Sequence, residues 1–432
     1  MASEWREGRL GDFIELHRGY DLPQQNRRPG PVPLVSSSGI SDHLAAAMID
    51  GPGVVTGRYG TIGQVFYLHE PFWPLNTTLY VSDFKGNDPR FASYLLRTVD
   101  FLAFSDKAAV PGVNRNHVHE AIIRWPVSLD EQKRIAGILG ALDDKIELNR
   151  CLSQTLESMA RALFKSWFVD FDPVRAIAEG RDAGLPSHIA DLFPDSFDKS
   201  ELGTVPSAWP VRSLGDLCSR VAIGPFGSDI TVDNFIDSGV PVVRGMNLKD
   251  GFLDDRFAFV NPVKADALRN ANAFPGDIVI THRGTLGQIG LIPDSSRFPR
   301  YVVSQSQMLL SVDRQAVAPQ YVYHYLRSPL GQHALLANAS QTGVPAIARP
   351  TTSLRAIRLL VPPIAISAEF GRMLRPLMDK RNRLASESLS LIDIRNGLLP
   401  GLLSGGLSAP SRSDLEPEWR LRAAFYASRG AS

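Results

Sequence analysis

The sequence predicts an α+β chain in which two mixed α/β globular parts are each followed by a long helix. Three observations predict this class. Short motifs recur in the same order in the two halves of the 432-residue chain. Each half opens with β-branched runs bounded by Gly and Pro, which is typical of short strands between turns. Each half closes with apolar residues recurring every three or four positions, which indicates an amphipathic helix.

Five motif pairs carry the repeat. The offset between paired positions grows from 204 residues at the first pair to 234 at the last. A steadily growing offset is expected when the second of two diverged copies has longer loops, so the pairs predict a pseudo-twofold internal repeat. The pairs are 10–12 with 214–216, 32–35 with 240–243, 58–63 with 283–287, 89–98 with 319–328, and 110–115 with 344–349.

The predicted globular parts are residues 1–129 and 204–362. Strands are expected at 52–56 and 275–281, where β-branched residues follow a Pro-Gly pair. Helices are expected at 89–104 and 319–338, because each stretch opens with a proline suited to the first helical turn. Each globular part is therefore expected to mix α and β structure.

Two long spacer helices are predicted, over 130–169 and 363–406. The first contains no proline, and Asp130 can cap it. The second contains Pro376, which is expected to kink it or delay its start. The apolar seam comprises Ile135, Leu139, Leu142, Ile146, Leu152, Leu156, Met159 and Leu163 in the first helix, and Phe370, Leu374, Leu377, Leu384, Leu391 and Leu398 in the second.

Each long helix could lie on a globular core, or the two could pack against each other. Their matching positions favour a helix pair. Asn149 in the seam either fixes the register as a buried polar residue or faces solvent.

Residues 170–203, rich in Asp, Pro and Gly, are predicted to be a connector, and 407–432 a polar tail. The predicted partner-binding residues of the seam are Ile135, Leu139, Leu142, Ile146, Leu156, Leu163, Phe370, Leu374, Leu377 and Leu391.

Composition excludes several classes. Apolar residues make up 44% of the chain and charged residues 21%, which excludes a disordered chain. The 46 basic and 45 acidic residues exclude a uniformly basic nucleic-acid binder. The cysteines Cys151 and Cys218 share no short spacing, which favours a reduced, cytoplasmic setting. The longest apolar run, 359–366, is too short to cross a membrane.

No catalytic constellation is recognisable. The chain has no GxxxxGK[ST] phosphate loop, no GxGxxG after a strand and no [DN]PP[YF] element. The pair His117 and His119 has only Glu120 as a nearby acid and no nearby cysteine, so no metal site is predicted. The sequence therefore indicates a binding protein that holds no cofactor or metal of its own.

Residues 3–406 resemble the specificity subunit of a type I restriction–modification system. The likeness rests on four motifs, of which the segment leaving the first long helix, 163–173, is the most specific. The motifs are 130–146 with the sequence DEQKRIAGILGALDDKI, 163–173 with LFKSWFVDFDP, 209–216 with WPVRSLGD, and 398–405 with LLPGLLSG.

The resemblance implies a DNA-binding subunit without an active site. Each globular part would be a target recognition domain reading half of a split, asymmetric site in double-stranded DNA, and antiparallel coiled-coil helices would set the gap between the halves. Two modification subunits would bind S-adenosylmethionine and methylate adenine at N6. Restriction motor-nuclease subunits would use ATP and Mg²⁺.

Candidate DNA-binding residues are polar side chains in loops beside the strands. Arginines that recur in both copies suit phosphate contact or a structural role, and non-recurring residues better suit base reading. Residues 1–129 hold 12 basic and 13 acidic side chains, and residues 204–362 hold 15 basic and 11 acidic side chains. Neither part is strongly basic, so its affinity for DNA must depend on where the basic side chains lie. The candidates are Ser36, Ser37, Ser38, Arg58, Tyr59, Thr61, Lys107, Asn114, Arg115 and Asn116, and then Arg244, Asn247, His282, Arg283, Thr285, Gln341, Thr342 and Arg349.

Two other functions stay open from the residues alone. The chain could be a coiled-coil adaptor that joins two protein partners, in which case it would not bind DNA. It could also be a free-standing enzyme, which would turn over a substrate without partners. The missing motifs disfavour the enzyme.

Overall fold

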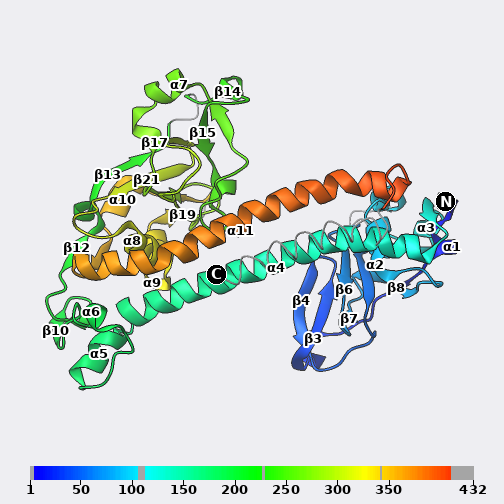
Figure 1. Ribbon diagram of the computed structural model, residues 1–432, viewed down its shortest axis with the longest axis horizontal. Coiled ribbons are helices and arrows are strands. Elements are labelled where there is room, and N and C mark those ends of the chain that lie inside the picture. Colours follow the sequence, from blue (N-terminus) through cyan, green and yellow to red (C-terminus); the bar gives the residue numbers. More distant parts are fainter. Residues whose placement is uncertain (1–3, 106–111, 226–228, 341–342, 410–432) are drawn as a thin grey trace, which may run out of the picture. The chain divides into compact units, whose positions relative to one another are not determined.

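A computed structural model describes residues 4–105, 112–225, 229–340 and 343–409. The chain divides into two compact units (Figure 1). Unit 1 comprises residues 1–146 and 390–432, and unit 2 comprises 147–389. The structure confirms a mixed fold of helices and strands with a long helix, α4 (Leu129–Phe168). Among the described residues, no helix combines the length and the apolarity that a membrane span requires.

Unit 1 is built on two small sheets and a strand pair. One sheet has the antiparallel order β2-β8-β5-β6, and the other has the order β4-β3-β7, with β3 and β7 parallel. The terminal strands β1 and β9 pair antiparallel. The strands are β1 (Trp5–Arg9), β2 (Glu15–Arg18), β3 (Pro29–Ser36), β4 (Gly39–Leu44), β5 (Gly53–Gly57), β6 (Val65–Leu68), β7 (Trp73–Pro74), β8 (Thr78–Asp83) and β9 (Ile122–Pro126).

Unit 2 contains sheets of corresponding order. The order β13-β21-β18-β19 matches β2-β8-β5-β6, and β16-β15-β20 within a five-stranded sheet matches β4-β3-β7. The strands are β10 (Phe197–Ser200), β11 (Gly203–Pro206), β12 (Val211–Ser213), β13 (Cys218–Ile223), β14 (Phe235–Ile236), β15 (Val240–Val243), β16 (Ala258–Val260), β17 (Asn272–Ala273), β18 (Ile278–Thr281), β19 (Ile289–Leu291), β20 (Tyr301–Val303), β21 (Gln307–Val312), β22 (Ala339–Ser340), β23 (Ala346–Ile347) and β24 (Arg358–Leu360).

Short helices connect these strands. In each unit a helix packs beside the four-stranded sheet. This helix is α2 in unit 1, which follows β8, and α8 in unit 2, which follows β21 (Figure 1). The helices other than α4 are α1 (Leu10–Phe13), α2 (Pro89–Leu96), α3 (Arg115–Val118), α5 (Asp172–Ala178), α6 (Ser187–Ala190), α7 (Pro262–Ala267), α8 (Pro319–Arg327), α9 (Pro329–Leu336), α10 (Pro350–Arg355) and α11 (Ile364–Ser404).

Two predicted helices are shorter than expected. The helix expected over 89–104 ends at Leu96 and is followed by a separate 3₁₀ turn, Phe101–Phe104. The helix expected over 319–338 is divided, because Pro329 lacks the N–H that would continue α8 and instead starts α9. The side chain of Ser328 caps α9 by accepting a hydrogen bond from the backbone N–H of Gly331.

Pro376 does not delay the start of helix α11, which lies within one residue of the predicted 363. It begins at Ile364 and continues through Pro376, whereas a delayed start was one of the two effects expected of that proline. Packing explains the continuation, because Phe370 and Leu374, on the N-terminal side of the proline, are fully buried in the unit 2 core. Burial of two large side chains outweighs one lost backbone hydrogen bond.

The predicted connector is folded. Residues 172–206 form two short helices and a hairpin, and their apolar side chains enter the unit 2 core, where Val174, Ile189, Phe193 and Val205 are buried. Trp167 and Phe168 at the end of α4 join the same core. This segment is therefore part of unit 2 rather than a loose linker.

Within each unit, part of α4 contacts part of α11. In unit 1 the Asp143 carboxylate of α4 accepts a 2.6 Å hydrogen bond from Arg395 of α11. In unit 2 the Glu157 carboxylate accepts a 2.7 Å bond from Arg381, and Asn149 Nδ2 donates to Glu387 at 2.9 Å. As residue numbers rise along α4 they fall along α11, so the contacting segments of unit 2 run antiparallel.

The apolar seam of α4 differs in part from its prediction. Asn149 is fully buried, which decides against a solvent-facing position. Leu152 and Met159, predicted in the seam, are 40% and 52% exposed. The buried positions instead follow Asn149, Ala160 and Phe164, because a straight α-helix has 3.6 residues per turn and drifts away from a strict heptad.

Candidate nucleic-acid interface

A polar hollow of unit 2 lies where β15, β18 and β21 meet the loops that follow them. It has a volume of about 400 Å³, and we call it the basic basin. Three cationic side chains line it, and no carboxylate is among its described lining residues. A concave surface with cations, hydroxyls and amides suits an anionic, hydrogen-bonding ligand. The lining residues are Arg244, Gly245, Met246, Lys249, Thr281, Arg283, Thr285, Gln288, Ser304, Ser306 and Gln307.

The floor of the basin is a fixed hydrogen-bond network. Gln307 Nε2 donates to the hydroxyl of Thr281 at 3.3 Å, and that hydroxyl donates to Gln288 Oε1 at 3.1 Å. Ser304 donates to Gln307 Oε1. Thr281 and Gln307 are almost fully buried. Since these groups satisfy one another, the floor is preorganised, and the sequence patterns did not single them out.

Arg244 is the basin residue with unused hydrogen-bonding capacity. Its backbone N–H donates to Asn247 Oδ1 at 3.0 Å, which fixes the start of the turn after β15. Its Nε atom is buried and has no hydrogen-bond partner in the described part of the chain. A buried guanidinium nitrogen without an acceptor is unusual in a native protein and favours a ligand acceptor there.

Arg283 and Thr285 stand at the exposed rim of the same basin. They lie on the turn between β18 and β19, where Gly284 and Gly287 have positive φ angles of 92° and 81° that only glycine adopts easily. His282 lies beside them but turns its Nε2 toward the carbonyl oxygen of Gln305, 3.2 Å away. Burial lowers the pKa of His282, so the ring is neutral at neutral pH.

Asn247 does not reach the surface. It is fully buried, and its Nδ2 donates to the carbonyl oxygens of Leu253 at 3.3 Å and Asp255 at 2.9 Å. Its side chain therefore holds the loop after β15 in place. An asparagine that caps a turn cannot be told from a base-reading asparagine by its residue type, which is why this candidate was selected.

The corresponding surface of unit 1 carries mainly hydroxyl groups, with the Arg58 guanidinium beside the Tyr59 ring. Ser36 ends β3, as Arg244 follows β15, and its hydroxyl lies 3.1 Å from that of Ser38. The side chain of Ser37 comes close to Gly60 on the β5–β6 turn. Tyr59 and Thr61 on that turn are exposed. We call this group, Ser36, Ser37, Ser38, Tyr59 and Thr61, the serine–tyrosine patch.

Arg58 has a structural role in unit 1. Its Nε donates to the carbonyl oxygen of Val113 at 3.2 Å, and its guanidinium lies 4.6 Å from the centre of the Tyr59 ring. The motif repeat pairs Arg58 with Arg283, but the backbone bridges join Tyr59 to Gly112 and Arg283 to Ala346, so Tyr59 is the structural counterpart of Arg283. The bridge recurs in both units, whereas the side chain there is a phenol ring in unit 1 and a guanidinium that lines the basin in unit 2.

The remaining described candidates mostly shape turns. Asn114 caps α3 by accepting from the backbone N–H of Asn116 at 3.0 Å. Arg115 donates to the carbonyl oxygen of Leu16 at 3.4 Å. The side chain of Asn116 and that of Arg349 are exposed, and Arg349 has a left-handed φ of 46° before Pro350. Lys107, Gln341 and Thr342 lie outside the described residues.

The predicted partner-binding residues are mainly interior. Ile135 and Leu139 are fully buried in the unit 1 core, and Phe370 and Leu374 in the unit 2 core, so these four side chains offer no surface to another chain. The others, Leu142, Ile146, Leu156, Leu163, Leu377 and Leu391, are half-buried.

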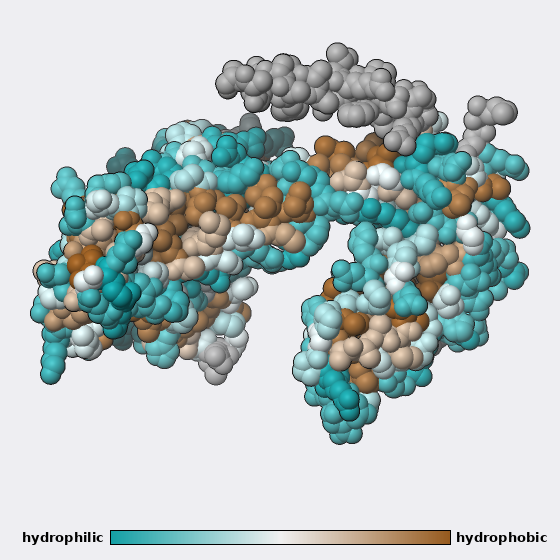
Figure 2. Space-filling model, turned by 60° about the horizontal axis from the view of Figure 1, so that its bottom comes forward, coloured by the Kyte–Doolittle hydropathy of each residue, from teal (hydrophilic) through white to brown (hydrophobic). Residues whose placement is uncertain are grey.

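Other apolar side chains of α4, outside the predicted partner-binding set, are exposed. Leu148, Leu152 and Met159 are 52%, 40% and 52% exposed and fall on one face of the helix. Across the viewed face of each unit, hydrophobic and hydrophilic residues are interspersed (Figure 2).

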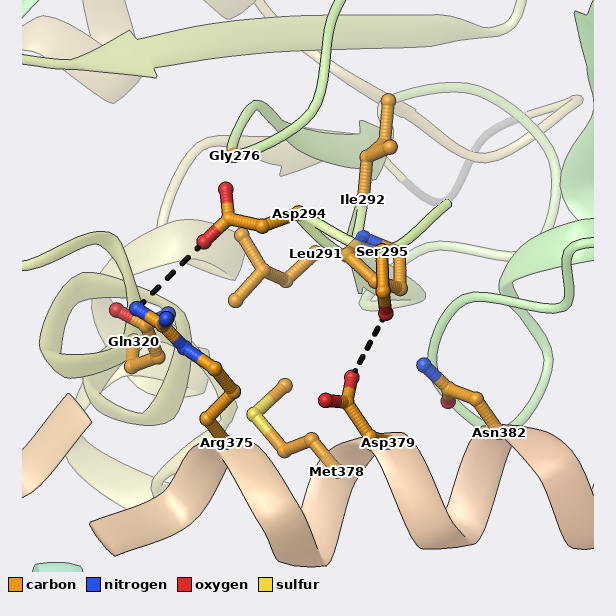
Figure 3. A pocket seen from close by; sticks show the side chains of 11 residues that line it. Gly276, Leu291, Ile292, Asp294, Ser295, Gln320, Arg375, Met378, Asp379 and Asn382 are labelled. Atoms are coloured by element: carbon orange, nitrogen blue, oxygen red, sulfur yellow. Dashed lines mark hydrogen bonds and ion pairs between the residues drawn. The ribbon is translucent and has the colours of Figure 1, made fainter. Parts of the chain in front are cut away.

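A second hollow, of about 280 Å³, separates α11 from the globular part of unit 2 (Figure 3). Its polar side chains bond one another across the gap. Ser295 donates to Asp379 of α11 at 3.0 Å, and Arg375 of α11 lies 3.8 Å from the Asp294 carboxylate. In unit 1, Arg90 of α2 similarly pairs with Asp144 of α4. These contacts attach each globular part to a long helix rather than form a ligand site.

One member of the histidine pair of unit 1 takes part in a structural hydrogen bond. His119 Nε2 accepts a 2.9 Å hydrogen bond from the backbone N–H of Leu16, and burial lowers its pKa. In the described ranges, no three His, Cys, Asp or Glu side chains are placed to hold a metal ion.

Known proteins resemble this chain in sequence and in fold. Residues 2–158 match the family described as the type I restriction modification DNA specificity domain. The resemblance predicted from the helix motifs is thereby confirmed.

Two curated relatives are named as specificity subunits of type I restriction enzymes. The chain is 25% identical over 346 residues to the type I restriction enzyme HindI specificity subunit of Haemophilus influenzae, covering 70% of this chain and 73% of the relative. It is 23% identical over 306 residues to the MjaIX specificity subunit of Methanocaldococcus jannaschii, covering 70% and 64%.

One solved structure shares the fold. The S subunit of a type I restriction–modification system from M. genitalium superposes with a TM-score of 0.61, at 16% identity, and covers 93% of this chain and 96% of that one. At this identity the likeness supports the fold alone.

Proposed function

We propose that this chain is the DNA-specificity subunit of a type I restriction–modification complex. It reads a bipartite, asymmetric site in double-stranded DNA, with unit 1 and unit 2 each carrying one target recognition domain. It positions two modification subunits and the restriction motor-nuclease subunits and carries out no chemistry itself. S-adenosylmethionine, ATP and Mg²⁺ belong to those partners.

The observation that carries the proposal is the contrast between two corresponding strand ends. The sheet orders of unit 1 and unit 2 correspond, yet Ser36 follows the parallel β3–β7 pairing where Arg244 follows the β15–β20 pairing. Two domains that read different half-sites need the same backbone fold but different side chains at the positions that contact the bases. The basic basin and the serine–tyrosine patch meet this requirement.

The pairing of α4 with α11 supports a spacer. Both helices have segments in each unit, so each recognition domain is connected to the other by continuous helix. Joining two modules through a rigid element makes the second binding event intramolecular and raises specificity. The gap between half-sites then becomes a geometric property of the protein.

Arg283 and Arg244 are expected to affect DNA binding differently. Arg283 stands at the basin rim, so Arg283→Ala should weaken binding of all sequences and lower the slope of log K against log salt by about 0.9. Arg244→Ala should reduce discrimination at one base pair by about 1–3 kcal/mol. Fluorescence anisotropy with cognate and singly substituted duplexes, using the complex with its modification subunits, measures both.

Arg181→Ala is the matched control, because Arg181 is exposed and pairs only locally, with Glu179. The assignment of the basin to DNA is wrong if Arg283→Ala has the same salt slope as Arg181→Ala.

The proposed function itself is tested by the methylome. Long-read sequencing of cells with and without the gene should show that deletion removes N6-methyladenine from one bipartite motif. Reintroducing the gene should restore that motif. If every methylated motif survives deletion, the chain is not the specificity subunit of an active modification complex, and the adaptor alternative gains support.

A further inference from the structure

A partly buried carboxylate of α4 joins three elements in unit 1. Asp143 accepts hydrogen bonds from Arg97, next to α2, at 3.2 Å, from Arg395 of α11 at 2.6 Å, and from the Tyr94 hydroxyl at 2.7 Å. The side chains of the three charged residues are between 22% and 29% exposed. We call Arg97, Asp143 and Arg395 the unit 1 cluster.

Unit 2 contains the same arrangement. Glu157 of α4 lies 3.0 Å from Arg327 of α8 and 2.7 Å from Arg381 of α11. These side chains are more buried, with 15%, 17% and 9% exposed. The guanidinium of Arg381 also lies against Gly251, where a side chain would collide with it. We call Arg327, Glu157 and Arg381 the unit 2 cluster.

The number of residues that separates the two clusters is the same on both helices. Asp143 and Glu157 are 14 residues apart on α4, and Arg381 and Arg395 are 14 residues apart on α11. Fourteen residues are two heptads, so each pair of side chains stands on nearly the same helix face. Between them in sequence, the buried Asn149 donates to Glu387. Recurring polar contacts at this spacing specify a single pairing of the two helices.

A slip in that pairing would separate buried charges. Moving α4 past α11 by one turn displaces each carboxylate from its arginine by about 5.4 Å. In the unit 2 cluster the displaced groups would remain largely buried and unpaired, which is strongly unfavourable, and the more exposed unit 1 groups would lose their partners at a smaller cost. An apolar seam alone tolerates such a slip better, because one leucine contact can replace another.

We propose that the unit 1 and unit 2 clusters set the register of α4 against α11, and that this register determines the gap between the two DNA half-sites. The first part concerns the chain alone. The second part rests on the proposed function. Each cluster also includes one arginine from a recognition domain, so the same contacts orient that domain on the helix pair.

The decisive variant replaces the unit 2 cluster by apolar residues of similar size, as Glu157→Met, Arg327→Leu and Arg381→Met. Such replacements of buried ion clusters usually preserve folding. The wild-type complex should methylate its own site about tenfold faster or more than a site whose gap differs by one base pair. In the variant this ratio should fall to about two- or threefold, with the half-site sequences unchanged.

A second measurement needs neither DNA nor partners. Cys151 on α4 and an Arg383→Cys substitution on α11 are both exposed positions of unit 2, and spin labels there report the pairing of the helices. Cys218→Ala removes the other thiol. The parent should give one narrow distance distribution, and the cluster variant a broad one or one shifted by about 5.4 Å.

The outcomes separate the two proposals. Unchanged gap selectivity and an unchanged distance distribution in the folded variant overturn the register role. If the wild-type complex methylates no bipartite site, the proposed function fails, and the spin labels still decide whether the cluster sets the register. The control pair Glu147→Gln and Arg150→Gln, on the exposed side of α4, should alter neither readout.

If the unit 2 variant does not fold, the unit 1 cluster provides the test. The substitutions Arg97→Leu, Asp143→Leu and Arg395→Met, with Tyr94→Phe to avoid an unpaired hydroxyl, should reduce gap selectivity in the same way. A folded unit 1 variant that retains the wild-type gap preference would contradict the proposal.

Discussion

Replacement of Trp167 by alanine is expected to destabilise unit 2 by about 3–5 kcal/mol, the usual range for truncating a buried tryptophan. Trp167 is 1% exposed at the end of α4. Its ring lies 5.0 Å from that of Phe193 and 6.0 Å from that of Phe370 on α11, measured between ring centres. The substitution therefore leaves a cavity where α4, α11 and the folded connector meet.

Urea denaturation followed by circular dichroism measures this effect as a lower transition midpoint. Met159→Ala is the control, because Met159 is on the same helix and 52% exposed, and it should shift the free energy of unfolding by no more than about 0.5 kcal/mol. Equal midpoints for the two variants would show that Trp167 does not hold the junction together.

Glu157→Gln is expected to destabilise the chain by about 3–5 kcal/mol at neutral pH. Glutamine keeps the volume but leaves Arg381 and Arg327, 9% and 17% exposed, without the charge that compensates them. The exposed Glu147, paired with Arg150 on the same helix, is the control, and Glu147→Gln should cost less than about 1 kcal/mol.

The same carboxylate predicts a pH dependence. Burial opposes ionisation of Glu157, but the charges of Arg327 and Arg381 lower its pKa to about 2. Because the folded pKa lies below the unfolded value of about 4.3, this stabilisation is complete above pH 4.3 and is lost between pH 4.3 and 2. Denaturation midpoints measured over this range should fall more steeply for the wild type than for Glu157→Gln. Parallel curves would exclude Glu157 as the titrating group.

Much of the fold could be read from the sequence because it depends on local pattern. The proline-free, amphipathic stretch after Leu129 predicts the 40-residue helix α4. The Gly-bounded, β-branched run before Thr281 predicts β18. These features need only neighbouring residues, so they are visible in one dimension. The prolines show the limit of such patterns. Tertiary packing continues α11 through Pro376, whereas Ser328, just before Pro329, caps a new helix.

The candidate interface was less accessible to sequence reasoning. The sequence motifs pair Arg58 with Arg283, yet the backbone bridges place Tyr59 at the position of Arg283, and only Arg283 lines the basic basin. Asn247 and Arg244 are both polar residues after one strand, yet one is fully buried and the other has an unpartnered nitrogen. Residue type and spacing cannot distinguish these roles, because they depend on which distant backbone atoms lie nearby.

By itself, the sequence determined the order of the motifs, the long helix α4 and the likeness to type I specificity subunits. The helix follows from periodicity, and the likeness rests on short motifs that can be read along the chain. Only the tertiary structure decided which polar residues are buried, that Asp143 and Glu157 of α4 each meet an arginine of α11, and that Arg244 lines a basin. Those pairings join residues up to 252 positions apart. The energy of a buried charge depends on its three-dimensional surroundings, which a linear pattern does not specify.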